Sequence, residues 1–480
     1  MRPTTRLSLL SLGTSLLAAT ASAGGGGYQF IDLGTLGGAN SSALGLNDAG
    51  QVVGWAEIPG CTTTNGFPCK RAFLWENGVM TDLGFLPGDE GSIARAINDA
   101  GLVVGNSERD VIAGSGTYHA VTWDAGGITP LVDLGQGTSW ADDVNASGTV
   151  AGYSTDPGSL RDSVVTWQGG AITNLGLNEP HSYSRGYGLN DGGVVVGFAW
   201  DLFQPNDTIL FDGSTWTQLG GFGQFQNSEG RDVNNTGVTV GLEAFPSGSW
   251  HGAYWSFGAS ATIDTGVLPG FELSELYDVN DAGVAVGRSY GDAQGLGSRA
   301  MLFDGTQLID INSLLPAGTN ALLLDANEIN EAGDIVGTAL IGNEGHAYLL
   351  RRTDSGTSFC MATQNSTGAP ASISASGSVS LGDNDLVLQA TSVPNTPFLF
   401  FYGPAQTLTP LGDGWLCVAG GITRIGAPQV ASSHTALKVV DVTAAGLQPG
   451  TTNFQCWFRD IAAGGTGNNT SDGVSVTFVP

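Results

Sequence analysis

A ten-residue motif recurs seven times between residues 45 and 337, and it constrains the fold more than any other feature of the chain. Each copy has an Asn followed by Gly three and seven residues later, as in GLNDAGQVVG at 45–54 and EINEAGDIVG at 328–337. Regular spacing of this kind is typical of repeat architectures, in which each unit is one small structural module. The Asn stands at positions 47, 98, 145, 190, 234, 280 and 330.

Each unit is predicted to contain four short strands and no helix. A short segment such as SSALGLN at 41–47 ends at the Asn, and the following Asp-Ala-Gly favours a tight turn because Gly accepts a positive φ. A β-branched run comes next, then an apolar strand ending in an aromatic residue, such as AFLW at 72–75, and a fourth strand such as VMTDLG. Four-stranded units of this length repeated around an axis indicate a β-propeller.

The two ends of the array favour a closed ring. The Asp-Leu-Gly ending of the fourth strand appears first at 32–34, before any Asn turn, and no such ending follows Leu350. The last unit therefore lacks an outer strand, and residues 30–34 are predicted to supply it beside 346–350, which removes an exposed sheet edge. We expect an all-β fold with a seven-bladed β-propeller at 24–351. An open solenoid is the alternative, but it needs capping units that neither end resembles.

The repeat resembles that of the secreted HAF-repeat proteins, which are named after a His-Ala-Phe tripeptide at the start of the third strand. That position reads Arg71-Ala72-Phe73, His119-Ala120-Val121, His251-Gly252-Ala253 and His346-Ala347-Tyr348 here. The GIN-D-x-G-x-VVG and DLG-x-LGG elements match more closely. The resemblance covers 28–350 and implies a secreted bacterial protein, without implying an activity or catalytic residues.

The last part of the chain loses the repeat. Residues 352–358 are predicted to be a linker, and the alternating segments of 359–480 predict a small C-terminal β-sandwich. The pieces FLFFYG, WLCVAG, FQCWFRD and SDGVSVTF resemble a C-terminal module found on secreted proteins of planctomycetes and related bacteria. Two roles are expected for it: packing or attaching the propeller, or acting as a sorting or surface-attachment signal.

The N-terminus predicts export. Residues 1–23 combine Arg2 and Arg6, an apolar stretch at 7–17 and Ala21-Ser22-Ala23, the pattern of a secretory signal peptide. No later run is apolar enough to span a bilayer, so a secreted or extracellular protein, or one held at the cell surface, is expected.

Export permits disulfides. Cys61 and Cys69 bracket a short loop and are predicted to pair. Cys360, Cys417 and Cys456 leave one pair and one free thiol, with the connectivity open.

Charge and motifs exclude several classes of function. The chain has 16 Lys and Arg against 44 Asp and Glu, a net charge of −28, which disfavours a nucleic-acid partner. HExxH, CxxC, GxSxG and GxxxxGK[ST] are absent, and the Asn turns offer too few oxygen ligands for a calcium loop. No metal and no cofactor is predicted, and a monomer is expected. His119, His251 and His346 share one repeat position, so they should lie apart.

Carboxylates stand two residues before the Asn in four units, at Asp143, Asp232, Asp278 and Glu328, with Arg95 and Arg231 in the same strands. Carboxylates near the central channel of a propeller could perform acid–base chemistry, as they do in glycosidases. They could equally form ion pairs with arginines between blades.

The loops on the face opposite the Asn turns vary in length, and variable loops on a rigid scaffold commonly carry binding sites. Aromatic rings beside carboxylates and amides suit sugars.

The predicted function is a secreted, non-enzymatic binding or adhesive propeller for a glycan or surface protein. The alternatives are a propeller-type hydrolase or lyase acting on extracellular polysaccharide, and a structural envelope component. An enzyme should show carboxylates within about 10 Å of one another in a pocket, whereas a binder should show an aromatic groove. The candidate ligand-binding residues are Asp89, Glu90, Trp140, His181, Tyr183, Arg185, Trp200, Trp250, Glu272 and Glu275.

Overall fold

The computed structural model describes most of the chain downstream of the predicted signal peptide, which lies outside the described residues. The described ranges are 28–63, 66–109, 117–176, 182–201, 204–219, 227–245, 248–256, 262–291, 297–316, 318–352, 356–377, 379–382, 384, 386–432 and 434–478. Strands dominate these ranges, and the helices are short. The predicted all-β class is confirmed. Within the same ranges, no helix is both long and apolar enough to cross a membrane.

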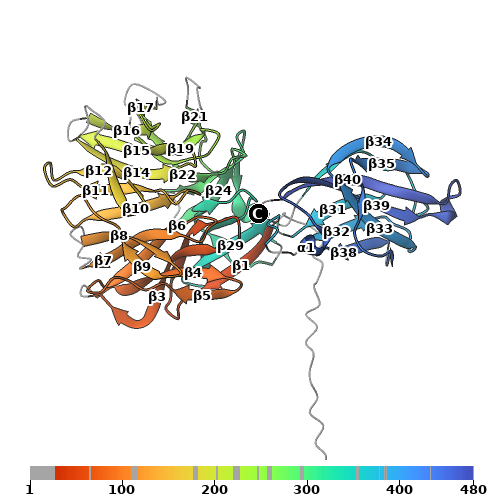
Figure 1. Ribbon diagram of the computed structural model, residues 1–480, viewed down its shortest axis with the longest axis horizontal. Helices are drawn as coiled ribbons and strands as arrows, with labels where there is room; N and C mark the ends of the chain where they lie inside the picture. The colour runs from red at the N-terminus through yellow and green to blue at the C-terminus, as the bar shows by residue number, and fades with distance from the viewer. Residues whose placement is uncertain are drawn as a thin grey trace, which may run out of the picture.

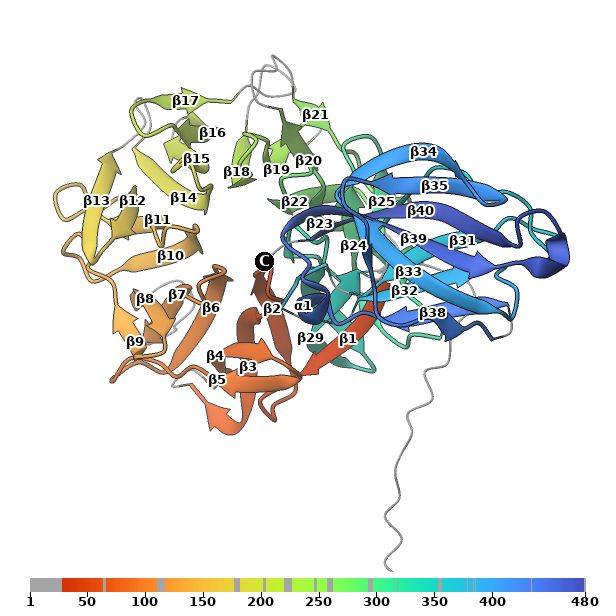
Figure 2. The ribbon, with the colours of Figure 1, turned by 45° about the vertical axis from the view of Figure 1, so that its right-hand side comes forward.

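Repeated four-stranded antiparallel sheets make up the repeat region, and each of the first six is built from consecutive strands. Figure 2 shows these sheets arranged around a common axis, with the first strand of each sheet nearest the axis. The predicted four-strand unit is confirmed. Sheets one to six contain β2 (Ser41–Leu46), β3 (Val52–Thr62), β4 (Pro68–Glu76) and β5 (Val79–Asp82); β6 (Gly91–Ile97), β7 (Val103–Arg109), β8 (Thr117–Asp124) and β9 (Gly127–Pro130); β10 (Ser139–Val144), β11 (Val150–Thr155), β12 (Asp162–Gln168) and β13 (Ala171–Gly176); β14 (Tyr183–Leu189), β15 (Val195–Asp201), β16 (Gln204–Phe211) and β17 (Trp216–Gln218); β18 (Ser228–Val233), β19 (Thr239–Ala244), β20 (Trp250–Trp255) and β21 (Ile263–Asp264); β22 (Leu273–Val279), β23 (Ala285–Tyr290), β24 (Ser298–Phe303) and β25 (Leu308–Asp310).

The seventh sheet combines the two ends of the repeat region. Its strands β26 (Leu322–Leu323), β27 (Glu328–Ile329), β28 (Ile335–Ile341) and β29 (Glu344–Arg352) come from the last repeat, and β1 (Tyr28–Gly34) comes from the start of the chain. β1 runs antiparallel to β29, with Phe30 opposite Leu350 and Asp32 opposite Tyr348. The Phe30 and Tyr348 rings stack with their centroids 6.2 Å apart. The first strand therefore occupies the outer position that the last repeat does not fill.

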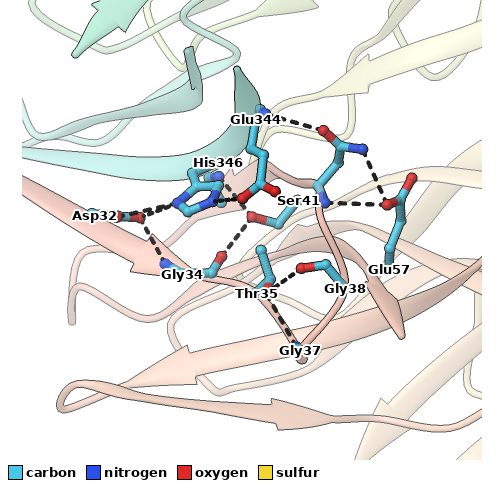
Figure 3. A network of polar contacts seen from close by, with 12 residues as sticks. Asp32, Gly34, Thr35, Gly37, Gly38, Ser41, Glu57, Glu344 and His346 are labelled. Carbon is cyan, nitrogen blue, oxygen red and sulfur yellow. Dashed lines mark hydrogen bonds and ion pairs between the residues drawn. The ribbon is translucent and has the colours of Figure 1, made fainter. Parts of the chain in front are cut away.

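Side chains around this junction link β1 to β29 within sheet seven, and they also join both strands to β2 of sheet one. His346 Nδ1 lies 3.0 Å from Asp32 Oδ1, and the amide of Ala347 donates to Ser41 Oγ at 2.8 Å. Ser41 Oγ donates in turn to the carbonyl of Gly34 at 2.6 Å. Figure 3 shows this network, in which one serine from β2 contacts both strands of the junction.

The repeated Asn explains how neighbouring sheets are held at the axis. Its side-chain Nδ2 donates to the main-chain carbonyl of the Asn in the next sheet, at 2.8 to 3.2 Å. The last of these bonds runs from Asn330 to the carbonyl of Asn47. The seven bonds thus return to the residue where they began.

Apolar side chains fill the space between sheets. One cluster, for example, joins Val53 and Ala72 of sheet one to Ala94, Val121 and Trp123 of sheet two. Both faces of the middle strands are covered in this way, which accounts for their nearly continuous apolar runs.

The remaining strands form separate sheets that share no strand with the repeat region in the described ranges. Two of these sheets pack around one core that contains Phe400, Phe454 and Phe458, and Figure 1 shows this part beside the repeat region. Because β29 ends at Arg352 and β30 begins at Thr357, the predicted linker at 352–358 contributes residues to strands at both ends. The first sheet contains β30 (Thr357–Phe359), β33 (Pro397–Gly403), β36 (Thr423–Arg424), β37 (Gln429–Val430), β39 (Gly450–Arg459) and β40 (Asn468–Phe478); the second contains β31 (Ser372–Ser376), β32 (Val387–Thr391) and β38 (Thr435–Val439); β34 (Ala405–Leu411) pairs with β35 (Gly414–Ala419). The helical segments are η1 (Ile311–Leu314), α1 (Val442–Ala445) and η2 (Ile461–Ala463).

Two disulfides are present. The predicted pair Cys61–Cys69 is confirmed, and it closes the hairpin of β3 and β4. The second disulfide joins Cys360 to Cys417, which leaves Cys456 as a buried thiol.

Candidate functional site

A β-bulge recurs in the inner strand of the first six sheets, three residues before the repeated Asn. The register shifts at this point in β2, β6, β10, β14, β18 and β22. A bulge adds one residue to a strand and changes the direction of its side chain. The residues at this position, which we call the bulge residues, line a single cavity of about 320 Å³. They are Leu44, Arg95, Asp142, Tyr187, Arg231 and Tyr277, with Asn327 at the same position of the seventh repeat.

The second Gly of the repeat permits this bulge. It lies in the second strand opposite the residue just before the bulge, as Gly241 lies opposite Gly230. A Cβ on Gly241 would stand 2.0 Å from the carbonyl oxygen of Glu229, and the equivalent glycines of the other sheets are similarly close to the inner strand. Only Gly allows the two strands to approach this closely.

Four carboxyl groups lie between the bulge residues and the Asn turns. Asp143, Asp232, Asp278 and Glu328 line both the cavity of the bulge residues and a second cavity of about 220 Å³, which the Asn turns also line. Residues from all seven repeats line each cavity, so together the two follow the axis, and we call them the central channel.

Three of these carboxyl groups bind the next sheet. Asp143 accepts a hydrogen bond from the amide of Leu189 at 2.7 Å, and Asp278 accepts one from Ile329 at 2.6 Å. Asp232 accepts from Val279 at 3.3 Å. Their partners are therefore main-chain amides rather than the arginines that the sequence suggested as an alternative.

The same carboxyl groups have raised pKa values. Burial, reinforced by repulsion from Asp232, raises the pKa of Asp143 to about 7. Burial also raises the pKa of Asp278 to about 6, and burial with repulsion from Asp278 holds the pKa of Glu328 well above its usual range. Part of this cluster is therefore protonated near neutral pH.

Two bulge residues that line the channel are bound to acids of their own strands, and one of these acids also pairs with an arginine. Arg231 pairs with Glu229 at 3.0 Å, and Arg288 pairs with Glu275 at 2.7 Å. Tyr277 donates its hydroxyl to Glu275 at 2.7 Å. These contacts fix partners for the Arg231 and Tyr277 side chains, which line the channel.

A second hollow is lined by residues of sheets one, two and three. This aromatic groove has a volume of about 530 Å³ and is lined by the rings of Trp55, Phe67, Tyr118 and Trp140. The rings of Tyr118 and Trp140 are 4.5 Å apart at their centroids, and Phe67 is 61% exposed. Large rings that stay accessible in a concave surface are typical of binding sites.

Polar groups border these rings. Glu57, Glu108, Lys70 and Asn40 also line the groove. Lys70 Nζ lies 3.9 Å from the centroid of the Trp55 ring. Burial lowers the pKa of Lys70 and raises that of Glu108, while their mutual attraction opposes both changes. Among the described residues, no group of three or more His, Cys, Asp or Glu side chains has an arrangement that would hold a metal ion.

The structure brings only some of the predicted ligand-binding residues to these hollows. Trp140 lines the aromatic groove, and Glu275 reaches the channel through its bond with Tyr277. Asp89 is buried and binds His119 at 3.0 Å and Arg109 at 3.1 Å.

The other predicted residues lie elsewhere. Tyr183 stacks on Trp200 with centroids 4.9 Å apart, and Arg185 pairs with Asp162 at 2.7 Å. The carbonyl of Glu90 accepts a bond from Arg71. Trp250 begins β20, Glu272 is exposed, and His181 lies outside the described residues.

Sequence reasoning missed two groups of residues. Trp55 and Tyr118 lie in strands that resemble ordinary β-branched or apolar runs, so no local signal shows that these half-buried residues line a groove. Asp142, Tyr187 and Tyr277 did carry a signal: an otherwise regular repeat has five different residue types among the seven positions that stand three residues before its Asn.

Comparisons with known proteins complete the description. No family model and no curated protein sequence matches this chain. Among solved structures, a puromycin hydrolase matches with 12% identity and a TM-score of 0.42, over 74% of this chain and 61% of the hydrolase. A prolyl endopeptidase matches with 10% identity and a TM-score of 0.42, over 74% of this chain and 54% of the peptidase. The β-propeller domain of the Trilobed protease from Pyrococcus furiosus matches with 10% identity and a TM-score of 0.33, over 58% of this chain and 98% of that domain. This chain thus spans less than two thirds of the hydrolase and of the endopeptidase.

Proposed function

We propose that this chain is a secreted, non-enzymatic binding protein that takes an extracellular glycan into its aromatic groove. The observation that carries the proposal is the groove itself, where Trp55, Phe67, Tyr118 and Trp140 line one concave surface. Aromatic rings pack against the apolar faces of sugar rings. The carboxyl groups of Glu57 and Glu108 in its lining offer acceptors for sugar hydroxyls.

The scaffold in this proposal is a closed seven-bladed propeller over residues 28–352. The pairing of β1 with β29 supports it, as do the hydrogen bonds that link the repeated Asn residues and return to Asn47. A closed ring fixes the relative positions of sheets one to three, and the Cys61–Cys69 disulfide restrains the hairpin that carries Trp55. The groove is therefore held in shape before a ligand arrives, which lowers the entropic cost of binding.

An extracellular setting is the second part of the proposal. The predicted signal peptide at 1–23 and two disulfides support it, since disulfides persist in oxidising compartments. The strands that follow the repeat region would then attach or support the propeller.

A glycan array screened with the mature protein, followed by titration of the best oligosaccharide, tests the proposal. Trp55→Ala should weaken binding about tenfold or more, because stacking on a Trp ring contributes up to a few kcal/mol. Trp250→Ala is the matched control, because Trp250 lies in sheet five, away from the groove. Binding that survives Trp55→Ala but is lost in Trp250→Ala would place the site elsewhere and overturn the groove assignment.

One observation favours a hydrolase as a second candidate. Tyr277 lines the central channel together with Asp232 and Asp278, and its hydroxyl donates to Glu275 at 2.7 Å. Most glycosidases use a pair of carboxyl groups, and some use a tyrosine nucleophile. Release of reducing ends from extracellular polysaccharides by the mature protein, abolished in Tyr277→Phe and Glu275→Gln, would establish this activity. Absence of release at high protein concentration would exclude it for those substrates.

A further inference from the structure

The aromatic groove contains a carboxyl group that belongs to a buried residue and has no protein partner. Glu108, in β7, is only 8% exposed and lines the groove. Its carboxyl group makes no hydrogen bond and no ion pair with any residue that the structure describes, and its oxygens keep some accessible surface. Because Glu108 lines the groove, these oxygens open onto it. A desolvated carboxylate without a donor carries a free-energy cost that a ligand can remove.

An ammonium group in the same groove also lacks a hydrogen-bond partner. Lys70, in β4, lines the groove, and its Nζ lies 3.9 Å from the centroid of the Trp55 ring. Over the described part of the chain, this Nζ forms no hydrogen bond and no ion pair. Attraction between Lys70 and Glu108 opposes the effect of burial on the pKa of each, yet the two groups are not in direct contact. The groove therefore holds an unused donor and an unused acceptor that are separate from each other.

The charges of the lining favour a neutral ligand group. Glu57 lies opposite Lys70 in the pair of β3 and β4, and its carboxyl group already accepts two hydrogen bonds from Asn40, at 3.2 and 3.0 Å. The carboxyl groups of Glu57 and Glu108 would repel an anionic group, and Lys70 would repel a cationic one. A group that binds both Lys70 and Glu108 should therefore be neutral, and it must both accept and donate a hydrogen bond.

An amide group meets this requirement better than a hydroxyl group does. Its carbonyl oxygen and its N–H point in opposite directions in one plane, so one can accept from Lys70 while the other donates to Glu108. Its dipole of about 3.5 D would align with the field between the cation and the anion. An acetamido group also carries a methyl group, which the rings of Trp55, Tyr118 and Trp140 can cover.

We propose that the aromatic groove binds glycans that contain N-acetylated amino sugars, with an acetamido group between Lys70 and Glu108. The carbonyl oxygen of this group accepts from Lys70 Nζ, its N–H donates to the Glu108 carboxylate, and its methyl group packs on the aromatic rings. The groove volume of about 530 Å³ lies within the usual range for ligand pockets. This inference rests on the proposed function, because it names the class of sugar that the same groove selects.

Titration calorimetry of the mature protein with triacetylchitotriose and cellotriose tests the inference. The two trisaccharides have the same linkage and differ only in the acetamido groups, which replace hydroxyl groups. A solution at pH 8 favours the ionised form of Glu108. Triacetylchitotriose should bind about tenfold or more tightly than cellotriose, because its amide forms hydrogen bonds with two charged groups.

Variants of the two charged residues test the assignment directly. Lys70→Met and Glu108→Gln each remove one charge and keep a side chain of similar length. Each should reduce the preference for triacetylchitotriose over cellotriose about fivefold or more, whereas a change that only loosens the groove should weaken the binding of both trisaccharides alike. The matched controls are Lys438→Met, which changes the other lysine of the chain, and Glu272→Gln, which changes an exposed glutamate. Both controls should keep the parent preference.

Thermal melting shows whether each variant folds, and Lys70→Met alone carries the test if Glu108→Gln does not. Equal affinity for the two trisaccharides would overturn the inference, as would an unchanged preference in the folded variants. Tighter binding of fully deacetylated chitotriose would also overturn it, because that sugar carries ammonium groups and would show that the groove selects cations.

Trp55→Ala separates this inference from the proposed function. If it weakens the binding of cellotriose or of a glycan from the array while triacetylchitotriose has no advantage, the groove binds glycans but does not select the acetamido group. If no glycan binds in a manner that depends on Trp55, the proposed function fails and the inference fails with it.

Discussion

At the scale of single residues, the repeated Asn shows why one side chain cannot be replaced by a similar one. In sheet four, Asn190 Oδ1 accepts from the amide of Val194 at 3.0 Å, which closes its own turn. Its Nδ2 donates to the carbonyl of Asn234 at 3.0 Å, which joins the next sheet. An Asp has two acceptors and no donor when ionised, so it could perform the first task only.

Asn190→Ala should destabilise the repeat region by about 1–3 kcal/mol, because it removes the partner of the Val194 amide and one of the two hydrogen bonds to the Asn234 carbonyl, which keeps only the bond from Gly237. Chemical denaturation monitored by tryptophan fluorescence measures this change. Asn343→Ala is the matched control, since Asn343 is exposed in the turn between β28 and β29 and should change stability by less than about 0.5 kcal/mol. Equal effects of the two variants would show that the inter-sheet bond contributes nothing.

Gly241→Ala tests the second glycine of the repeat. The added methyl group would meet the Glu229 carbonyl oxygen at 2.0 Å, so the bulge in β18 has to shift. We expect a loss of about 3 kcal/mol. The control is Gly345→Ala, where the nearest atom to a new Cβ is 3.5 Å away. A thermal melt of each protein gives the comparison, and a tolerated Gly241→Ala would contradict our account of why the glycine recurs.

At the scale of elements, β1 is far apart in the sequence from the other strands of its sheet. It pairs over Tyr28–Gly34 with β29, and its Leu33 is buried in a cluster that also holds Val336 and Leu349 of sheet seven and Phe73 of sheet one. Removing β1 exposes the edge of β29 and opens this cluster. An unpaired edge is a template for another strand.

Deletion of residues 24–34 should therefore lower the melting temperature and promote aggregation, and a synthetic peptide YQFIDLG added in trans should restore part of the stability. Strand addition of this kind depends on main-chain hydrogen bonds. A control peptide with Ile31→Pro should not restore stability. Ile31 lies opposite Leu349 in the strand pair, and Pro has no main-chain N–H to donate there. Equal rescue by both peptides would mean that the effect is not strand pairing at β29.

At the scale of the whole molecule, the spacing of the repeat was enough to predict the all-β class and the four-strand unit. Asn and Gly recur where each turn requires them, so a local signal exists for every unit. The variable position three residues before each Asn marks Asp142 and Tyr187 in the sequence, but it does not reveal the bulge, because a one-residue shift in register depends on how two strands pair. The pairing of Cys360 with Cys417 and the position of Trp55 in the groove depend on contacts between distant segments, which a single sequence does not display.

The central channel predicts an unusual pH dependence for the whole molecule. Asp143 and Glu328 have pKa values above their usual range, so the folded state binds more protons than the unfolded state between about pH 4 and the raised values. The contribution of these groups to stability therefore falls as pH rises through this window. The melting temperature of the parent protein should accordingly be higher at pH 5 than at pH 8.

Glu328→Gln removes one charge from a cluster whose other members repel it. The variant should raise the free energy of unfolding at pH 8 by about 1–3 kcal/mol and flatten the dependence of the melting temperature on pH. Glu272→Gln, an exposed control, should keep the parent profile. Melting curves of the parent protein and both variants between pH 5 and pH 8 test this prediction. An unchanged pH dependence in Glu328→Gln would show that the carboxyl groups of the channel do not titrate as a cluster.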